Sequence, residues 1–314
     1  MLKNLLEDKH CFKLVCGAGN EDVESIRRLV YLYALAGCRF FDLSANEEVV
    51  DAALETLHNA NIYDAYICVS VGIKSDPHCN KAVINYDKCI NCGSCESICP
   101  QGAIHYAKVK KSKCIGCGRC WKVCPKMAIS YNPEEKKLDE ILPQLIKKGI
   151  DCIEFHVIGQ DENEIFSKWQ YINETFDGML SICISRGKLG DEALIERIQK
   201  MIANRTPYST IIQADGFPMS GGADDYKTTL QAVATAEIVQ NANLPVYLML
   251  SGGTNSKTTE LAQMCSINYH AVAVGSYARK IIKKYIERQD FWTNQLVIED
   301  ALNIIKPLID SVIL

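Results

Sequence analysis

Sixteen of the 314 residues are cysteines, and eight of them lie between residues 89 and 124. The spacing Cys-x2-Cys-x2-Cys-x3-Cys-Pro occurs twice there, with the second copy 25 residues after the first. Four thiolates on one short segment can hold a metal ion or cluster, because thiolate sulfur is a preferred ligand of zinc and iron. A disulfide framework would require an oxidising compartment, and the first residues have no apolar stretch typical of a secretory signal. The cysteines therefore indicate metal binding.

The repeated spacing resembles that of bacterial ferredoxins with two 4Fe-4S clusters. Three cysteines on a tight loop can contact three irons of one cluster, and the fourth is carried away by the following helix toward the other cluster. The resemblance implies two ligand sets: Cys89, Cys92, Cys95 and Cys124 for cluster 1, and Cys114, Cys117, Cys120 and Cys99 for cluster 2.

Paired zinc sites are the alternative, because four thiolates also suit zinc. Zinc requires neither the three-residue gap, nor the prolines, nor the duplication, so the pattern favours iron–sulfur clusters. Gly93, Gly116 and Gly118 would let backbone N–H groups approach the sulfur atoms and help to set the potential. Among the other eight cysteines, Cys79 is the first candidate for an additional thiol, and those near predicted strands are expected to be buried.

The cysteine-rich segment is also basic. Residues 80–132 contain nine Lys or Arg and two acidic residues, whereas the whole chain has a net charge of −4. Part of this excess would offset the negative charge of the clusters. The remainder, especially at residues 108–113, could dock an acidic partner, or it could belong to a solvated hairpin beside an acidic barrel.

A second set of candidate residues follows the last predicted strands, in segments 215–222, 251–255 and 275–279. Glycines that lead into a helix N-terminus can bind phosphate through backbone N–H groups and the helix dipole. The alternative is that these glycines only form tight turns. Asp215 is a candidate general acid or base, or the cap of the following turn, and His156 could also face this site. The candidates for a phosphate-bearing ligand or FMN are Gly252, Gly253, Gly275, Ser276 and Arg279.

These residues must be positioned by alternating strands and helices. Short apolar runs predict eight strands, at residues 12–16, 40–43, 65–71, 152–157, 180–184, 210–213, 246–250 and 271–274. The stretches between them predict helices at 22–36, 47–59, 138–148, 164–176, 192–203, 228–241 and 257–265. Eight such units predict an α/β fold of the (β/α)8, TIM-like type. A doubly wound open sheet is the alternative.

The cysteine repeat is then an insertion after the third strand. We expect residues 1–79 to form the first part of the barrel, residues 80–132 the ferredoxin-like module with two 4Fe-4S clusters, and residues 133–314 the remainder. A hydrophobic content of 48% excludes a mainly disordered chain, and no apolar run is long enough for a membrane span. The slightly acidic balance argues against general nucleic-acid binding. These features predict a cytoplasmic protein.

The chain is similar over nearly its whole length to the light-dependent period (LdpA) family of cyanobacterial iron–sulfur proteins. The similarity rests on the cysteine module and on segments 13–18, 33–37, 215–221, 251–255 and 275–280. It implies a redox-sensing input of light to the circadian clock and association with clock proteins, including histidine kinases. One difference is that the first cysteine motif of the family is less regular than residues 89–99 here.

Two main functions follow from these features. The first is a redox sensor or electron-transfer protein without turnover, in which the state of the clusters changes the binding of a partner. The second is an oxidoreductase whose clusters exchange electrons with FMN or with a phosphorylated ligand at the barrel mouth. The third hypothesis is a barrel that only presents the ferredoxin.

Overall fold

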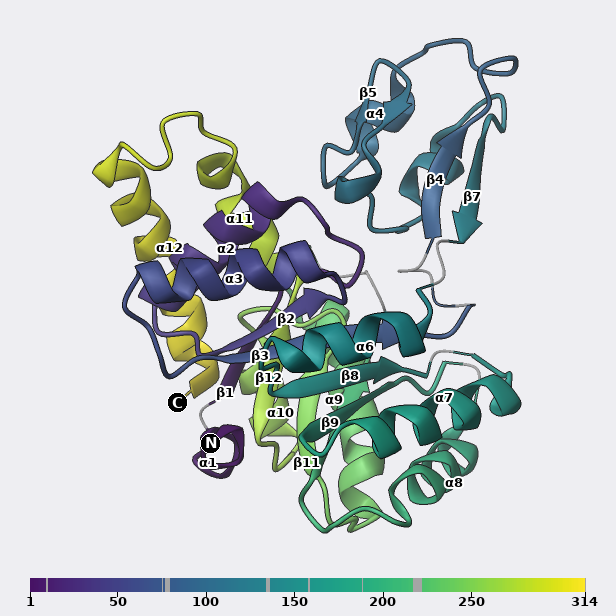
Figure 1. Ribbon diagram of the computed structural model, residues 1–314, viewed down its shortest axis with the longest axis vertical. Helices are drawn as coiled ribbons and strands as arrows, with labels where there is room; N and C mark the ends of the chain where they lie inside the picture. The colour runs from purple at the N-terminus through teal and green to yellow at the C-terminus, as the bar shows by residue number, and fades with distance from the viewer. Residues whose placement is uncertain are drawn as a thin grey trace.

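A computed structural model describes residues 1–9, 11–74, 76, 80–133, 136–157, 159–187, 189–216 and 222–313. Eight parallel strands form a closed barrel in the order β1-β12-β11-β10-β9-β8-β3-β2 (Figure 1). The strands are β1 (Cys11–Val15), β2 (Phe40–Ser44), β3 (Tyr66–Gly72), β8 (Cys152–His156), β9 (Met179–Ile184), β10 (Thr210–Asp215), β11 (Tyr247–Ser251) and β12 (Ala271–Val274). The predicted barrel and its eight strands are confirmed, and the open-sheet alternative is wrong because β1 pairs with both β2 and β12.

Helices surround the barrel and bury their apolar faces against it (Figure 1). The seven predicted helices are confirmed as α2 (Val23–Leu35), α3 (Glu47–Asn59), α6 (Leu138–Lys147), α7 (Glu162–Thr175), α8 (Asp191–Ile202), α9 (Tyr226–Asn241) and α10 (Thr258–Met264). Several of them begin at a side chain that accepts a backbone N–H, as Asp22 does for α2 and Asn46 for α3.

Three helices beyond the predicted set complete the outer layer and the base. The helix α11 (Ser276–Ile286) follows β12, and α12 (Gln295–Ile313) packs against α11 and α2. The short helix α1 (Leu2–Glu7) buries Leu2 and Leu6 in one apolar cluster with Phe40 and Met249. It therefore closes the end of the barrel opposite the mouth.

The inserted module lies between β3 and β8, and so at the C-terminal end of the barrel strands, where barrels of this type carry their sites. Antiparallel pairing of β4 (Asn80–Ile84) with β7 (Ile129–Pro133) brings its two ends together. Between these strands are α4 (Ser94–Ile98), the hairpin β5 (Ile104–His105) and β6 (Lys108–Val109), the 3-10 turn η2 (Lys111–Lys113) and α5 (Arg119–Val123).

Polar contacts hold the module against the barrel. The Lys81 ammonium is buried and donates to the carbonyl of Gly19 at 2.7 Å and to that of Cys114 at 2.9 Å. The basic run at residues 108–113, considered above for an acidic partner, contacts the barrel itself, because Lys110 pairs with Asp22. No helix among the described residues is long and apolar enough to cross a membrane.

Candidate functional site

The eight cysteines of the module surround two separate hollows. A cavity of about 520 Å³ is lined by Cys89, Cys92, Cys95 and Cys124. A narrow second hollow of about 20 Å³ is lined by Cys99, Cys114, Cys117 and Cys120. In each group, three thiols come from one repeat and the fourth comes from the other repeat. We call these the first and the second thiol group.

Left-handed backbone turns wrap each cysteine loop around its hollow. In the first loop, Gly93 has φ of 76° and directly precedes α4, and in the second, Gly118 has φ of 77° and directly precedes α5. An L-residue adopts this conformation only with strain, so glycine suits both positions. Each helix then carries the last cysteine of its repeat away from its own loop, which explains the crosswise grouping.

Backbone N–H groups point at several of the sulfur atoms. The amide of Ala103 lies 3.3 Å from the Cys99 sulfur, and the amide of Ala128 lies 3.3 Å from the Cys124 sulfur, at the equivalent position of the second repeat. The amide of Ala82 lies 3.4 Å from the Cys114 sulfur. Such donors stabilise thiolate charge, and around metal clusters they tune the potential.

The donor set fits an iron–sulfur cluster in each hollow. All eight thiols are free, and both sets consist of sulfur alone. Burial raises the pKa of Cys117 and Cys120, and neighbouring thiols raise it further. Four thiolates crowded together in this way need a cation to balance them, as iron does in a cluster.

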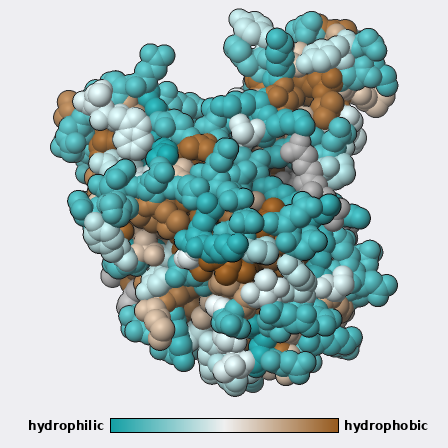
Figure 2. Space-filling view, in the orientation of Figure 1, coloured by the Kyte–Doolittle hydropathy of each residue, from teal (hydrophilic) through white to brown (hydrophobic). Residues whose placement is uncertain are grey.

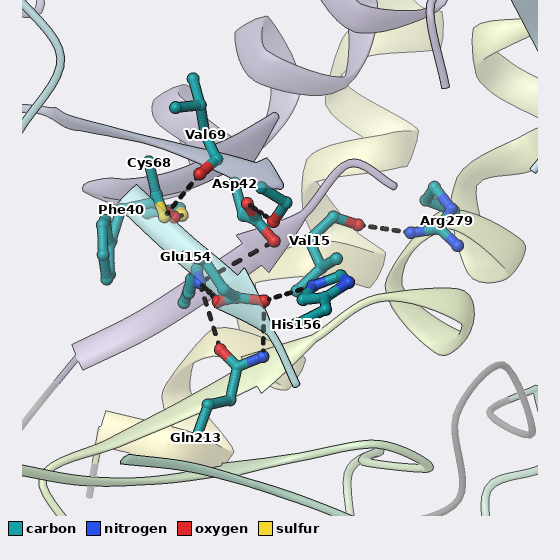
Figure 3. A network of polar contacts seen from close by, with 12 residues as sticks. Val15, Phe40, Asp42, Cys68, Val69, Glu154, His156, Gln213 and Arg279 are labelled. Carbon is teal, nitrogen blue, oxygen red and sulfur yellow. Dashed lines mark hydrogen bonds and ion pairs between the residues drawn. The ribbon is translucent and has the colours of Figure 1, made fainter. Parts of the chain in front are cut away.

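The interior of the barrel contains a buried polar layer (Figure 3). The Lys13 ammonium is fully buried, pairs with Glu154, and lies 3.1 Å from the Gln213 carbonyl oxygen and 3.8 Å from an Asp42 oxygen. The Gln213 amide donates to Glu154 at 2.9 Å, so the Glu154 carboxylate has partners from two other strands, Lys13 of β1 and Gln213 of β10. Asp42 in turn accepts from Ser70 at 2.6 Å.

His156 connects this layer to the mouth. Its two ring nitrogens lie 2.8 Å from Asp76 and 2.9 Å from Glu154. Burial disfavours the imidazolium, but the two carboxylates outweigh burial and raise the pKa of His156 well above its usual value. Burial opposes ionisation of Glu154 as well, yet Lys13 and His156 lower its pKa to about 2. Burial dominates at Asp42 and raises its pKa to about 6.

One atom each of Glu154, His156 and Cys183 lies within 4.8 Å of the others, a spacing that could hold a metal ion. Glu154 already pairs with Lys13, and His156 already contacts two carboxylates. A cation here would compete with a buried ammonium, so the module is the better metal site.

The barrel mouth brings together every residue predicted for it. A cavity of about 90 Å³ is lined by His156 and Glu154, by Ile115 of the module, and by Asp215, Gly252, Gly253, Gly275, Ser276 and Arg279. A Cβ at Gly252 would lie 1.9 Å from an Asp215 carboxylate oxygen, so only glycine fits there. Of the segment 215–221, residues 217–221 lie outside the described part of the chain, as does Cys79.

Arg279 is the unusual cation of the mouth. It is only 9% exposed and donates to the carbonyl of Val15, while its Nε has no hydrogen-bond partner. Burial lowers its pKa. Among the described residues, no carboxylate pairs with it. An unsatisfied buried guanidinium N–H is costly.

The sequence analysis named His156 but missed the other members of the buried polar layer, which are Lys13, Asp42, Glu154 and Gln213. A signal was present, because each is a polar residue in the middle of an apolar strand. In β1, β2, β8 and β10 these residues alternate with side chains that face the helices, and alternate residues of a strand share one face. A polar residue at a strand position that faces the barrel interior therefore indicates a functional site there.

The fold and the cysteine module together define an iron–sulfur protein built on a (β/α)8 barrel. The 4Fe-4S dicluster domain model matches residues 82–131, and the model of the Light dependent period A C-terminal domain matches residues 144–309. The chain belongs to the Light dependent period A family. It is 32% identical over 298 residues to Light dependent period A of Synechococcus elongatus, covering 90% of this chain and 84% of that protein.

Solved structures support the fold alone. The YdjI aldolase from Escherichia coli K12 is 8% identical with a TM-score of 0.53, and the alignment covers 100% of this chain and 94% of that one. Tryptophan synthase from M. tuberculosis is 10% identical with a TM-score of 0.50, over 99% of this chain and 98% of that one.

Proposed function

We propose that the module binds two 4Fe-4S clusters, one in each thiol group. Cys89, Cys92, Cys95 and Cys124 would hold cluster 1, and Cys114, Cys117, Cys120 and Cys99 would hold cluster 2. The observation that carries this proposal is the crosswise arrangement of eight free thiols around two hollows. It agrees with the two-cluster ferredoxin pattern. The module would then comprise residues 80–132, within a barrel formed by residues 1–79 and 133–314.

The protein then acts as a redox sensor or electron-transfer protein rather than through turnover. The relationship to Light dependent period A supports a role in the light input to the circadian clock. We propose clock or other signalling proteins as its partners and the cytoplasm as its compartment. A one-electron reduction adds a negative charge to the module. Partner binding senses this change only if the two redox states have different affinities for the partner.

Anaerobic purification, an absorbance spectrum, and quantitation of iron, sulfide and flavin test this function. We expect about eight irons and about eight sulfides per chain with no flavin, and a broad cluster absorbance that bleaches on reduction. Bound zinc without sulfide would contradict the proposal.

A second candidate function is an oxidoreductase that binds FMN or another phosphorylated ligand at the mouth. The specific observation in its favour is the unpartnered Nε of Arg279, beside the glycines of two βα turns. Asp215 and His156 would be its acid–base residues. Stoichiometric flavin in the purified protein would favour this function over the sensor.

The substitution Gly275→Val tests ligand binding at the barrel mouth under either candidate function. A Cβ at Gly275 lies 3.2 Å from Val15 and 3.3 Å from Arg279, so a branched side chain must intrude on the cavity. If FMN or phosphate binds there, we expect its affinity to fall at least roughly tenfold, with unchanged iron and sulfide. Isothermal titration calorimetry measures the affinity, and Gly187→Val is the control, because Gly187 is exposed and a Cβ there would lie 4.0 Å from the Ser185 hydroxyl. Undiminished affinity would rule out the mouth.

A further inference from the structure

A large cavity lies between the module and the barrel helices and adjoins the mouth. Its volume is about 730 Å³, enough for a small organic molecule. One wall is the module around Cys99 and Cys117, and the opposite wall is formed by α2 and α11. Figure 2 shows the surface deeply hollowed between the module and the helices beside it.

The lining of this cavity is strongly basic. Three acidic side chains, Asp22, Glu24 and Glu287, stand against six basic ones: Arg28, Lys113, Arg119, Arg279, Lys280 and Lys283. Arg28 is neutralised by Glu24, and Lys283 lies 3.6 Å from Glu287. No carboxylate of the described residues pairs with Arg119, Arg279 or Lys280. The net positive charge is therefore available to an anion.

Two further features point to phosphate chemistry at the inner end. The helix α11 begins at Ser276, which lines the cavity, so the positive end of an 11-residue helix faces it. Arg279, on the first turn of that helix, is nine-tenths buried and has an unpartnered Nε. Ser276, Arg279 and Ile115 line both this cavity and the mouth, so the two spaces adjoin.

The cavity also touches the second thiol group. Cys99 and Cys117 line both the cavity and the second hollow, and Arg119 lowers the pKa of Cys117 against the dominant effect of burial. A ligand in the cavity would thus lie beside the proposed cluster 2, with only these cysteines and their loop between.

We propose that this cavity binds a phosphorylated small molecule, with phosphate against Arg279 and the N-terminus of α11, and that reduction of cluster 2 weakens the binding. The redox part rests on the proposed function, because it requires a cluster held by Cys99 and Cys117. Reduction adds one negative charge to a wall that the anion contacts, and like charges repel most strongly where water is partly excluded. By linkage, the bound anion must make cluster 2 harder to reduce by the same free energy.

The test uses the iron-loaded full chain and inorganic pyrophosphate as the probe, by anaerobic calorimetry. Titrations are made on the oxidised protein and on protein reduced electrochemically with a viologen mediator. We expect Kd to rise roughly tenfold on reduction. We expect Arg119→Gln and Lys280→Gln each to weaken binding several-fold, because each removes one facing charge, and Lys306→Gln, at an exposed site on α12, to leave it unchanged.

The outcomes separate this inference from the proposed function. Eight irons with no pyrophosphate binding, or with binding that Arg119→Gln and Lys280→Gln leave unchanged, would overturn the anion site while the clusters stand. Binding with the same Kd in both redox states would overturn the coupling. If only one cluster is present, the proposed function fails, and binding that both variants weaken would still support the anion site.

Discussion

Cys117→Ser is expected to lower bound iron from about eight to about four atoms per chain, with an equal loss of sulfide. Cys117 lines the hollow of the second thiol group, whereas the first group takes no ligand from its loop. A serine hydroxyl stays protonated at neutral pH and cannot replace a thiolate in holding a cluster. Iron and sulfide analysis after anaerobic purification measures the loss.

Cys92→Ser provides the complementary result, because Cys92 belongs to the first thiol group. Each variant should lose one cluster, and the double variant should lose both. Cys265→Ser is the matched control, since Cys265 is an exposed thiol outside the module. If the Cys117→Ser protein retains its full iron and sulfide, Cys117 is not a cluster ligand.

Glu154→Gln is expected to lower the free energy of unfolding at pH 7 by roughly 3–5 kcal/mol, the usual cost of breaking a buried ion pair on one side. The substitution removes the charge that faces both Lys13 and His156, and both of these are buried. Lys13 would retain only Asp42, at 3.8 Å, as a charged partner among the described residues. Anaerobic urea unfolding measures the difference.

The pH dependence identifies the cause of this loss. The pKa of Glu154 is lowered from 4.5 to about 2, so its contribution is complete above pH 4.5 and disappears as pH falls toward 2. The difference between wild type and Glu154→Gln should therefore shrink at pH 3. Glu174→Gln, on the exposed face of α7, is the control. A difference that is equal at pH 3 and pH 7 would exclude the ion pair as its origin.

The contribution of His156 to stability has the opposite pH dependence. Its pKa is raised, so the stabilisation by Asp76 and Glu154 is complete below pH 6.5 and is lost only as pH rises through the folded-state pKa. Asp42 also makes the folded state more stable at low pH, because its raised pKa of about 6 makes its ionisation costly in the folded state. The polar layer is therefore a charge network whose contribution to stability changes with pH.

Features that depend on neighbours along the chain could be predicted from the residues alone. Cysteines two or three residues apart share a loop wherever the loop lies, so the metal module followed from spacing. Strand and helix propensity are also local, and all eight barrel strands were found. The number and alternation of these elements then left a closed barrel as the preferred arrangement. Three helices were missed: α1 and α12 belong to no strand–helix unit, and α11 follows the last strand, β12.

Which distant side chains meet became visible only in the folded chain. Lys13 and Glu154 are 141 residues apart, and Lys13 and Gln213 are 200 apart, yet barrel closure places all three in one buried layer. The cavity beside the second thiol group depends on how the module lies against α2 and α11, through contacts such as that of Lys81 with Gly19. No local pattern encodes such contacts, because strand pairing and domain packing arise from surfaces that meet only in the folded chain.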